Sequence, residues 1–248
     1  MSRVKLTVCY PYYRHQETIK RHLAEWLSWS PELRMHFEFI IVDDGSPEPL
    51  ELPVCDLNLR QFRVTKDIPW NYGAKNLAVS KAMTEWLFIS ELDHMITERA
   101  AQLLLQLCKS DDHDRVTTVN RQASSTKADE RYTVKKHPAT WLLTRTMFEA
   151  AGGFDEDFSG RYGHDDTYFV ACLQRVGAKF QHAPTVVLTC FSGNHDLPDA
   201  DLTGVVEKDP THNTELLKQK LKYMAKPENP LRFDWKHVGR LTMEGAQH

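Results

Sequence analysis

Strand-like and helix-like segments alternate through the first half of the chain, and this order limits the possible folds more than any other feature. A β-α-β-α order predicts a mostly parallel sheet that is covered by helices on both faces. The expected strands are residues 4–8, 37–42, 61–65 and 86–90, and the expected helices are residues 18–27, 74–83 and 98–108.

Polar segments follow three of these strands at the point where each strand ends. They are Tyr10-Pro11-Tyr12, Asp43-Asp44-Gly45-Ser46 and Glu91-Leu92-Asp93-His94. Parallel sheets bind ligands at the carboxyl ends of their strands, so we expect the three segments to converge on one crevice.

The last of these segments has the donor atoms of a metal site. Glu91 and Asp93 are two residues apart, so their carboxylates face the same way in extended chain. Two hard oxygen donors suit Mg²⁺ or Mn²⁺ bound to phosphate oxygens, and the imidazole of His94 favours Mn²⁺. The alternative is a solvated strand end without a metal.

The second half of the chain has a different rhythm. Polar residues 120–137 separate two expected strands, and they form either a mobile loop or hairpin near the site or plain solvated surface. After a glycine-rich turn at 151–156, a helix begins at Asp165-Asp166, and a later amphipathic helix follows in the C-terminal part. The expected strands are 115–119, 140–144 and 184–190, and the expected helices are 165–176 and 214–224.

Composition excludes several classes of protein. The 248 residues suffice for one large α/β domain or two joined lobes. With 31 Lys+Arg against 34 Asp+Glu, the chain lacks the basic charge of a nucleic-acid-binding protein. It shows no membrane span and no signal-peptide core, so we expect a cytoplasmic protein. Its five cysteines are scattered without CxxC spacing, which predicts reduced thiols that pack as small apolar groups.

Five motifs in order resemble a known family. They are Val-Asp-Asp-Gly-Ser (42–46), Gly-Ala-Lys-Asn (73–76), Phe-Ile-Ser-Glu-Leu-Asp-His (88–94), Gly-Gly-Phe-Asp-Glu (152–156) and Gly-His-Asp-Asp-Thr-Tyr-Phe (163–169). The series is similar to the GT-A nucleotide-sugar glycosyltransferases, and most similar to their inverting family-two group, over about residues 4–195.

The resemblance implies an α/β fold with a single GT-A, Rossmann-like domain. Its mostly parallel central sheet would be flanked by helices. We expect this domain at residues 1–200, with a nucleotide-binding half at about 1–97 and an acceptor-binding half at 98–200. Residues 201–248 would form a C-terminal helical extension.

The resemblance also implies a donor site for the nucleotide-sugar. The base and ribose would contact Pro11, Tyr12, Asp43 and Asp44, whereas an ordinary turn is the other interpretation of the two aspartates. The segment near the diphosphate would contribute Gly73, Lys75 and Asn76. Lys75 stands where relatives more often have Arg, and the alternative for it is a solvated side chain at a helix start.

The metal motif departs from the family's Asp-x-Asp because Glu91 stands first, where it could reach the ribose or the metal. Asp93 matches the coordinating position. His94 could be a ligand, a partner of a ligand or a surface residue. His195 matches a region where relatives supply a metal-binding imidazole, and His182 competes for that role.

Asp165 and Asp166 match the family's Glu-Asp motif, in which a carboxylate at a helix start is the general base. A helix N-terminus stabilises carboxylate charge, while a neighbouring like charge raises one pKa. Relatives suggest Asp166 as the base and Asp165 as the orienting group, and helix capping is the alternative. A sugar-stacking wall of Trp70, Tyr72, Trp141 and Tyr162 is a further possibility, with core packing as the alternative for Trp141.

Together these roles predict an inverting, metal-dependent transfer from a nucleotide-sugar donor, with a UDP-sugar as the expected donor and a glycan or other hydroxyl compound as the acceptor. Mn²⁺ or Mg²⁺ on Asp93 would neutralise the departing nucleoside diphosphate, and a carboxylate would deprotonate the acceptor. Two alternatives stay open: a nucleotidyltransferase on a similar sheet, and a non-catalytic carbohydrate-binding or scaffold protein. The sequence leaves open the acceptor, the oligomeric state and whether the chain is one module of a larger protein.

Overall fold

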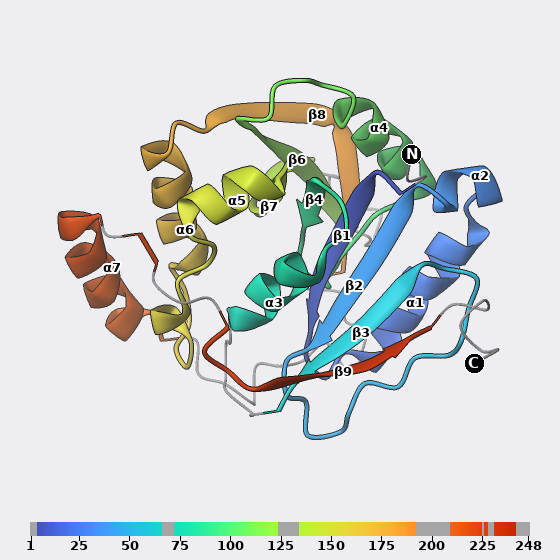
Figure 1. Ribbon diagram of the computed structural model, residues 1–248, viewed down its shortest axis with the longest axis horizontal. Coiled ribbons are helices and arrows are strands. Elements are labelled where there is room, and N and C mark those ends of the chain that lie inside the picture. Colours follow the sequence, from blue (N-terminus) through green and yellow to red (C-terminus); the bar gives the residue numbers. More distant parts are fainter. Residues whose placement is uncertain are drawn as a thin grey trace, which may run out of the picture.

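The computed structural model describes residues 4–65, 72–123, 134–191, 209–224, 226–227 and 231–241. These residues form an α/β fold around one mixed sheet with the strand order β5-β8-β6-β7-β4-β1-β2-β3-β9 (Figure 1). The strands are β1 (Leu6–Tyr12), β2 (Phe37–Asp43), β3 (Leu59–Val64), β4 (Trp86–Ile89), β5 (His94–Met95), β6 (Arg115–Ala123), β7 (Lys135–Thr144), β8 (Lys179–Cys190) and β9 (Trp235–Arg240).

The expected parallel sheet is present in the first half of the chain. Strand β1 pairs in parallel with both β2 and β4, and β2 pairs in parallel with β3. In the second half, β7 runs antiparallel to β4 and β6, while β6 and β8 are parallel. The expected strands at 115–119, 140–144 and 184–190 are parts of longer strands, so the arms of β6 and β7 extend into the polar segment 120–137.

Helices cover both faces of the sheet, as expected. The cluster on one face joins the sheet to α1 (Gln16–Ser28), α2 (Pro31–Arg34) and α4 (Glu98–Leu107). The cluster on the other face joins it to α3 (Gly73–Lys81), α5 (Arg145–Ala151) and α6 (Asp165–Arg175). A short 3-10 helix, η1 (Glu156–Phe158), precedes α6, and α7 (Thr211–Tyr223) packs on the outer side of α6 (Figure 1).

Aromatic packing anchors each helix layer to the sheet. Trp26 of α1 stacks on Phe39 of β2 with ring centroids 4.2 Å apart, and Trp141 of β7 packs edge-on against Phe169 of α6 at 5.4 Å. Such pairs contribute about 0.5–1.5 kcal/mol each beyond the burial of apolar area. Every residue of β2 is buried, as is typical of a central strand covered on both faces.

The register places several strand ends at one edge of the sheet. Tyr12 pairs with Asp43, and Cys9 pairs with Ile89, so β1, β2 and β4 point the same way. The backbone N–H of Asp44 donates to the carbonyl of Tyr12 (2.8 Å), which joins the first two polar segments directly. The segment after β4 begins beside them.

The C-terminal part is more than the helical extension that we expected. It contains α7, but it also adds β9 antiparallel to β3 at the edge of the sheet. In β9, five of the six residues are exposed, so the strand has no buried apolar stripe that a sequence pattern could reveal. Among the helices in the described ranges, none is long and apolar enough to cross a membrane.

Candidate active site

Asp43 braces the turn after β2. Its buried carboxylate accepts the backbone N–H groups of Ser46 (2.9 Å) and Leu50 (3.0 Å), and Arg63 Nη1 lies 2.5 Å from it. Gly45 has a φ of 77°, a conformation that glycine adopts without strain. Asp44 follows at the end of the strand and is 8% exposed. The first aspartate therefore shapes the turn that carries the second.

The end of β1 lies beside this turn. Pro11 is partly buried, and the hydroxyl of Tyr12 donates to Gln16 Oε1 (3.4 Å) at the start of α1. The backbone N–H of Arg14 donates to Ser46 Oγ (3.1 Å), so the two segments form one rigid corner.

Lys75 lies between the loop after β4 and the start of α6. It is 4% exposed, and its Nζ is 3.4 Å from Glu91 Oε1 and 3.5 Å from Asp165 Oδ2. The Phe154 ring centroid is 4.7 Å from the same nitrogen. Burial lowers the pKa of Lys75, but Asp165 and Glu91 outweigh that effect and raise the pKa above its usual value. Lys75 is therefore a charged, buried link between two acidic segments, not a solvated side chain.

Asn76 holds the glycine-rich turn in place. Its Oδ1 accepts from Phe154 N (2.9 Å), and its Nδ2 donates to Phe154 O (2.9 Å) and Glu156 Oε1 (2.8 Å). A Cβ on Gly153 would lie 2.7 Å from Asn76 Oδ1. Gly73 is the first, buried residue of α3 and supplies backbone only.

Asp93, His94 and Cys190 bring three kinds of metal-binding atom together. A donor atom from each side chain lies within 4.8 Å of the other two, and His94 pairs with Cys190 across β5 and β8. His94 Nδ1 is 2.5 Å from Asp93 Oδ1, and a third of the Asp93 side chain is exposed. Sequence reasoning missed Cys190, because its neighbours in this cluster are almost a hundred residues earlier in the chain.

Two influences act on the charge of His94. Burial lowers its pKa, but the contacts with Asp93 and Cys190 raise it to about 9. Arg121 Nη1 of β6 lies 3.4 Å from Nε2 of the same ring. Burial also raises the pKa of Glu91, with Asp93 and Asp165 acting in the same direction and Lys75 against them.

Two buried aromatic residues support the loop that carries Glu91 and Asp93. Tyr10 donates its hydroxyl proton to the carbonyl of His94 (2.7 Å), and His22 Nε2 lies 2.7 Å from the carbonyl of Leu92. Burial lowers the pKa of His22 to about 4, so its neutral ring donates from Nε2. The sequence placed Tyr10 in the first strand-end segment and His22 in an amphipathic helix, and it gave neither residue this supporting role.

Asp165 and Asp166 lie in the first turn of α6, and neither is its N-cap. His164 takes that position and makes no side-chain cap. Asp165 is buried against Lys75. Burial raises its pKa above the usual value, Asp166 acts in the same direction, and Lys75 only partly offsets them. Asp166 is partly exposed. The Asp166 carboxylate nevertheless accepts the backbone N–H of Thr167 (2.6 Å), so the capping alternative stays open for it. The pair presents one buried and one partly exposed carboxylate.

The remaining candidates are distributed as follows. Trp141 is fully buried against Phe154 and Phe169, so its core alternative is correct. His182 is exposed, bonded to Thr118, and stands eight residues before Cys190 on β8, on the other side of an irregularity in the pairing of β8 with β6. Tyr162 is partly buried. His195 and Trp70 lie outside the described residues.

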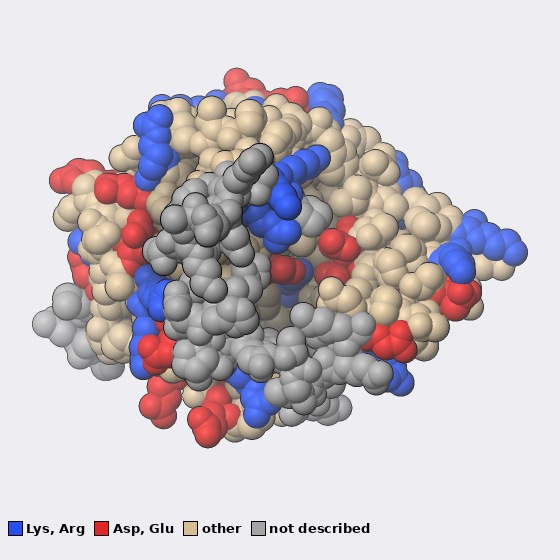
Figure 2. Space-filling model, turned by 180° about the vertical axis from the view of Figure 1, so that it is seen from behind, with Lys and Arg blue, Asp and Glu red and all other residues tan. Residues whose placement is uncertain are grey.

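The site thus combines Glu91, Asp93, Asp165 and Asp166 with the buried cation of Lys75. On the face shown in Figure 2, acidic and basic side chains lie side by side around a hollow. That mixed charge differs from the uniform basic surface of a nucleic-acid-binding protein.

Comparison with known proteins identifies the family. Residues 7–177 match the model of glycosyl transferase family 2, and the chain belongs to that family. The fold is accordingly the GT-A fold. A search of curated proteins finds no match.

Two solved structures share the fold at low sequence identity. S. aureus TarS 1-349 in complex with UDP-GlcNAc has a TM-score of 0.65 and 13% identity, and the match covers 92% of this chain and 68% of that one. Mannosyltransferase PcManGT from Pyrobaculum calidifontis, in complex with GDP-Man and Mn2+, has a TM-score of 0.57 and 17% identity, with 78% and 58% covered. The chain thus spans little more than half the length of the mannosyltransferase.

Proposed function

We propose that the protein transfers a sugar, with inversion, from a nucleotide-diphosphate sugar to a hydroxyl group of a glycan or similar acceptor. One observation carries the proposal: Lys75 joins the acidic loop after β4 to the two first-turn carboxylates of α6. Donor-side and acceptor-side acids thereby meet at one edge of the sheet, within a family-two domain.

The donor's nucleotide would lie against Pro11, Tyr12 and the Asp43-Asp44 turn. The relatives are bound to UDP-GlcNAc and to GDP-Man, which supports a nucleotide-diphosphate sugar as the class of donor. A UDP-sugar is our specific proposal, since an aspartate carboxylate can accept the N–H of a uracil ring. The Asp43 carboxylate already holds Ser46, Leu50 and Arg63, so its proposed part is to shape the turn that carries Asp44.

The donor atoms present fit a divalent transition metal. Asp93 would hold it, with His94 and Cys190 close enough to contribute. A carboxylate, an imidazole and a thiol together suit Mn²⁺ or a softer ion better than Mg²⁺, which prefers oxygen ligands. When bound, such an ion supplies positive charge beside the diphosphate of the donor.

Asp166 is the proposed general base. It is partly exposed, so it can accept the proton of an acceptor hydroxyl, and the helix N-terminus stabilises its charge. Asp165 would orient the first turn of α6, which carries Asp166, through its ion pair with Lys75. Attack by the deprotonated oxygen from the face opposite to the diphosphate inverts the anomeric carbon.

The test is a panel of UDP-, GDP- and other nucleotide sugars, with release of the nucleoside diphosphate measured in Mn²⁺, in Mg²⁺ and in chelator. Once a donor and acceptor turn over, we expect Asp166→Asn to lower kcat about 10²–10⁴-fold, the usual contribution of a general base. Asp112→Asn is the control, because Asp112 lies on the surface and pairs with Lys179. Wild-type rates in Asp166→Asn and Asp93→Asn would refute the assigned roles, and a product of retained configuration would refute inversion.

A further inference from the structure

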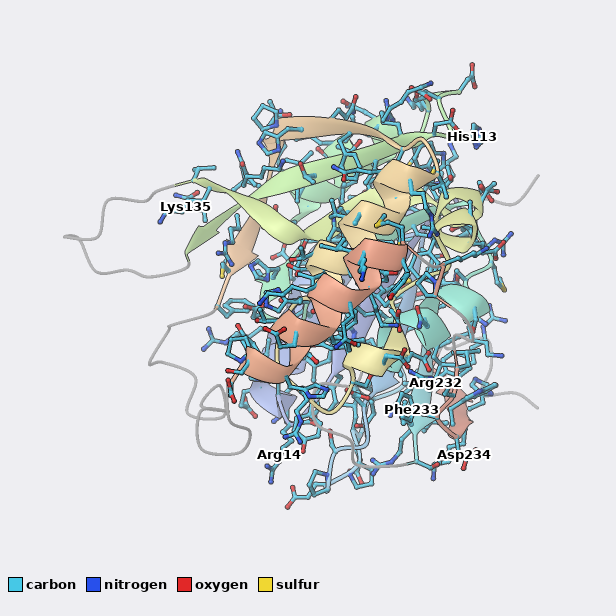
Figure 3. All side chains as sticks on the ribbon, turned by 90° about the vertical axis from the view of Figure 1, so that its left-hand side faces the viewer. Arg14, His113, Lys135, Arg232, Phe233 and Asp234 are labelled. Carbon is cyan, nitrogen blue, oxygen red and sulfur yellow. The ribbon has the colours of Figure 1, made fainter. Side chains whose placement is uncertain are left out.

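Helix α7 lies beyond residues 7–177 of the family match, yet it contacts the loop that leads to Asp165 and Asp166. Figure 3 shows α7 lying along α6. The loop comprises residues 158–164 and is called here the base loop. Its contacts with α7 come from buried polar side chains and not from apolar packing alone.

Asn213 is the centre of these contacts. It is fully buried, and its Nδ2 faces three carbonyls of the base loop: Phe158 (3.1 Å), Arg161 (3.0 Å) and Gly163 (2.9 Å). Buried carbonyls need such donors, because leaving them unsatisfied is costly. One side chain of α7 therefore fixes the path of the loop at three points.

Thr214 fixes the residue directly before the two aspartates. Its hydroxyl donates to Pro210 O (2.8 Å), so its oxygen is free to accept from His164 Nε2, which lies 2.8 Å away. His164 has a φ of 68°, a left-handed conformation that a non-glycine residue keeps only when its surroundings enforce it. The hydrogen bond requires the tautomer that carries its proton on Nε2.

Tyr72 holds the base loop from the opposite side. Its hydroxyl donates to Arg161 O (3.3 Å) and accepts from Gly163 N (3.2 Å), and its backbone N–H donates to Ser159 Oγ (3.1 Å). Tyr72 immediately precedes α3, the helix that carries Lys75. The base loop is thus held between the donor-side helix α3 and the C-terminal helix α7.

We propose that α7 is a positioning element of the active site, in which Asn213 and Thr214 set the base loop so that the first turn of α6 presents Asp166 to the acceptor. The inference rests on the proposed function and adds a control point outside the family-matched region. These side chains act on the proposed base, Asp166, and not on the proposed nucleotide-binding residues at Pro11, Tyr12 and Asp43-Asp44. Their loss therefore lowers kcat and leaves donor affinity unchanged.

The test compares Thr214→Val, Thr214→Ser and Asn213→Ala with Lys218→Ala, an exposed position on the same helix. Misplacement of a catalytic group by about 1 Å can cost 10²-fold, so we expect kcat to fall about 10–100-fold in Thr214→Val and Asn213→Ala. Donor KM and donor affinity by calorimetry should stay at wild-type values. Thr214→Ser should restore kcat, and Lys218→Ala should not change it.

A second measurement does not depend on activity. We expect NMR of the His164 ring to show the Nε2–H tautomer in the wild type and in Thr214→Ser, and a mixture in Thr214→Val. Amide exchange of residues 158–165 should accelerate in Thr214→Val and Asn213→Ala, below the melting temperature of each variant. Wild-type kcat in both variants, or an equal loss of kcat and donor affinity, overturns the inference. If the wild type turns over no nucleotide sugar, the proposed function fails. Separately, an unchanged His164 tautomer and unchanged amide exchange in the variants would refute the positioning of the base loop by Asn213 and Thr214.

Discussion

At the scale of single residues, Lys75 differs most from what its sequence context suggests. A lysine at a helix start is commonly solvated, and the family resemblance placed it near a diphosphate. In the structure it is buried between Glu91 and Asp165. Asp165 is 90 residues away in the chain, so no local pattern could reveal this partner. The same limit applies to Cys190, whose place beside Asp93 depends on the pairing of β5 with β8.

Replacement of Lys75 by Met should destabilise the protein. The change leaves the buried Asp165 carboxylate without its cation, and we expect a loss of about 2–4 kcal/mol in unfolding free energy, moderated by the partial exposure of Glu91. Urea unfolding measures the loss, with the exposed Lys20→Met as the control.

The pH dependence of this loss has a definite sign. The pKa of Asp165 is already raised by burial and would rise further without Lys75. A carboxyl whose pKa is higher in the folded state destabilises the fold fully above that pKa, progressively less between it and the unfolded pKa, and not at all below the unfolded pKa. The penalty of Lys75→Met should therefore be largest near neutral pH and shrink on acidification to about pH 4. A penalty that grows on acidification would contradict the buried link.

Replacement of Cys190 by Ser should change which metal binds. If the thiol contributes beside Asp93 and His94, the wild type binds Zn²⁺ or Co²⁺ more tightly than Mg²⁺. We expect Cys190→Ser to weaken Zn²⁺ binding by roughly 10–100-fold, the range seen when groups that support a site are lost, with little effect on Mg²⁺. Calorimetry measures both ions, and Cys108→Ser is the control. Equal Zn²⁺ affinity in all three proteins would remove Cys190 from the ligand set.

At the scale of elements, the success of sequence reasoning follows the kind of signal each element carries. Strands β1, β2 and β4 are almost entirely buried, and their many apolar residues, alternating in β1 and mostly continuous in β2 and β4, made them predictable. The two-residue β5 and the exposed β9 have no such pattern, because pairing with distant strands creates them. The positions of Asp165 and Asp166 in the first turn of α6 were predictable, whereas the hydrogen bonds from Asn213 to the base loop were not.

The turn at Gly152-Gly153 depends on α3 through Asn76, and Gly153→Ala should show this. Gly153 has a φ of 72°, and a Cβ would lie 2.7 Å from Asn76 Oδ1. We expect a loss of about 2–4 kcal/mol, the sum of left-handed strain and displacement of the amide. Gly177→Ala is the matched control, since its φ is 88° and its Cβ would meet nothing within 4 Å. That change should cost only about 1–2 kcal/mol. Equal losses in urea unfolding would show that the Asn76 contact contributes nothing.

At the scale of the whole molecule, the C-terminal part completes the domain. The Glu156 carboxylate accepts the backbone N–H groups of Leu231 (2.5 Å) and Arg232 (2.8 Å), and Lys220 of α7 is 2.6 Å from Asp155 and 2.7 Å from Asp157. The expected division into a domain at 1–200 and an extension at 201–248 therefore crosses many contacts. Fold class and strand-end chemistry were predictable from local patterns and motif order. These hydrogen bonds and ion pairs were not, because they join residues about 60–75 positions apart in the chain.

The charge of the whole site leads to a last prediction about donor binding. Among the described residues, the four carboxylates of Glu91, Asp93, Asp165 and Asp166 outnumber the cationic side chains beside them, which are Lys75, His94 and Arg121. A diphosphate entering this region is repelled unless a divalent ion accompanies it. We therefore expect UDP to bind only with Mn²⁺ or a similar ion, and chelator to weaken its affinity at least about 100-fold, or some 2.7 kcal/mol.

Uridine is the matched control ligand, because it contains the base and ribose without the phosphates. Its affinity should be low and the same with and without metal. Calorimetry of both ligands, in Mn²⁺ and in chelator, separates the contribution of base and ribose contacts at Asp43-Asp44 from that of diphosphate binding near Glu91 and Asp93. Tight UDP binding in chelator would mean that protein cations alone neutralise the diphosphate, and the metal assignment to Asp93 would then be wrong.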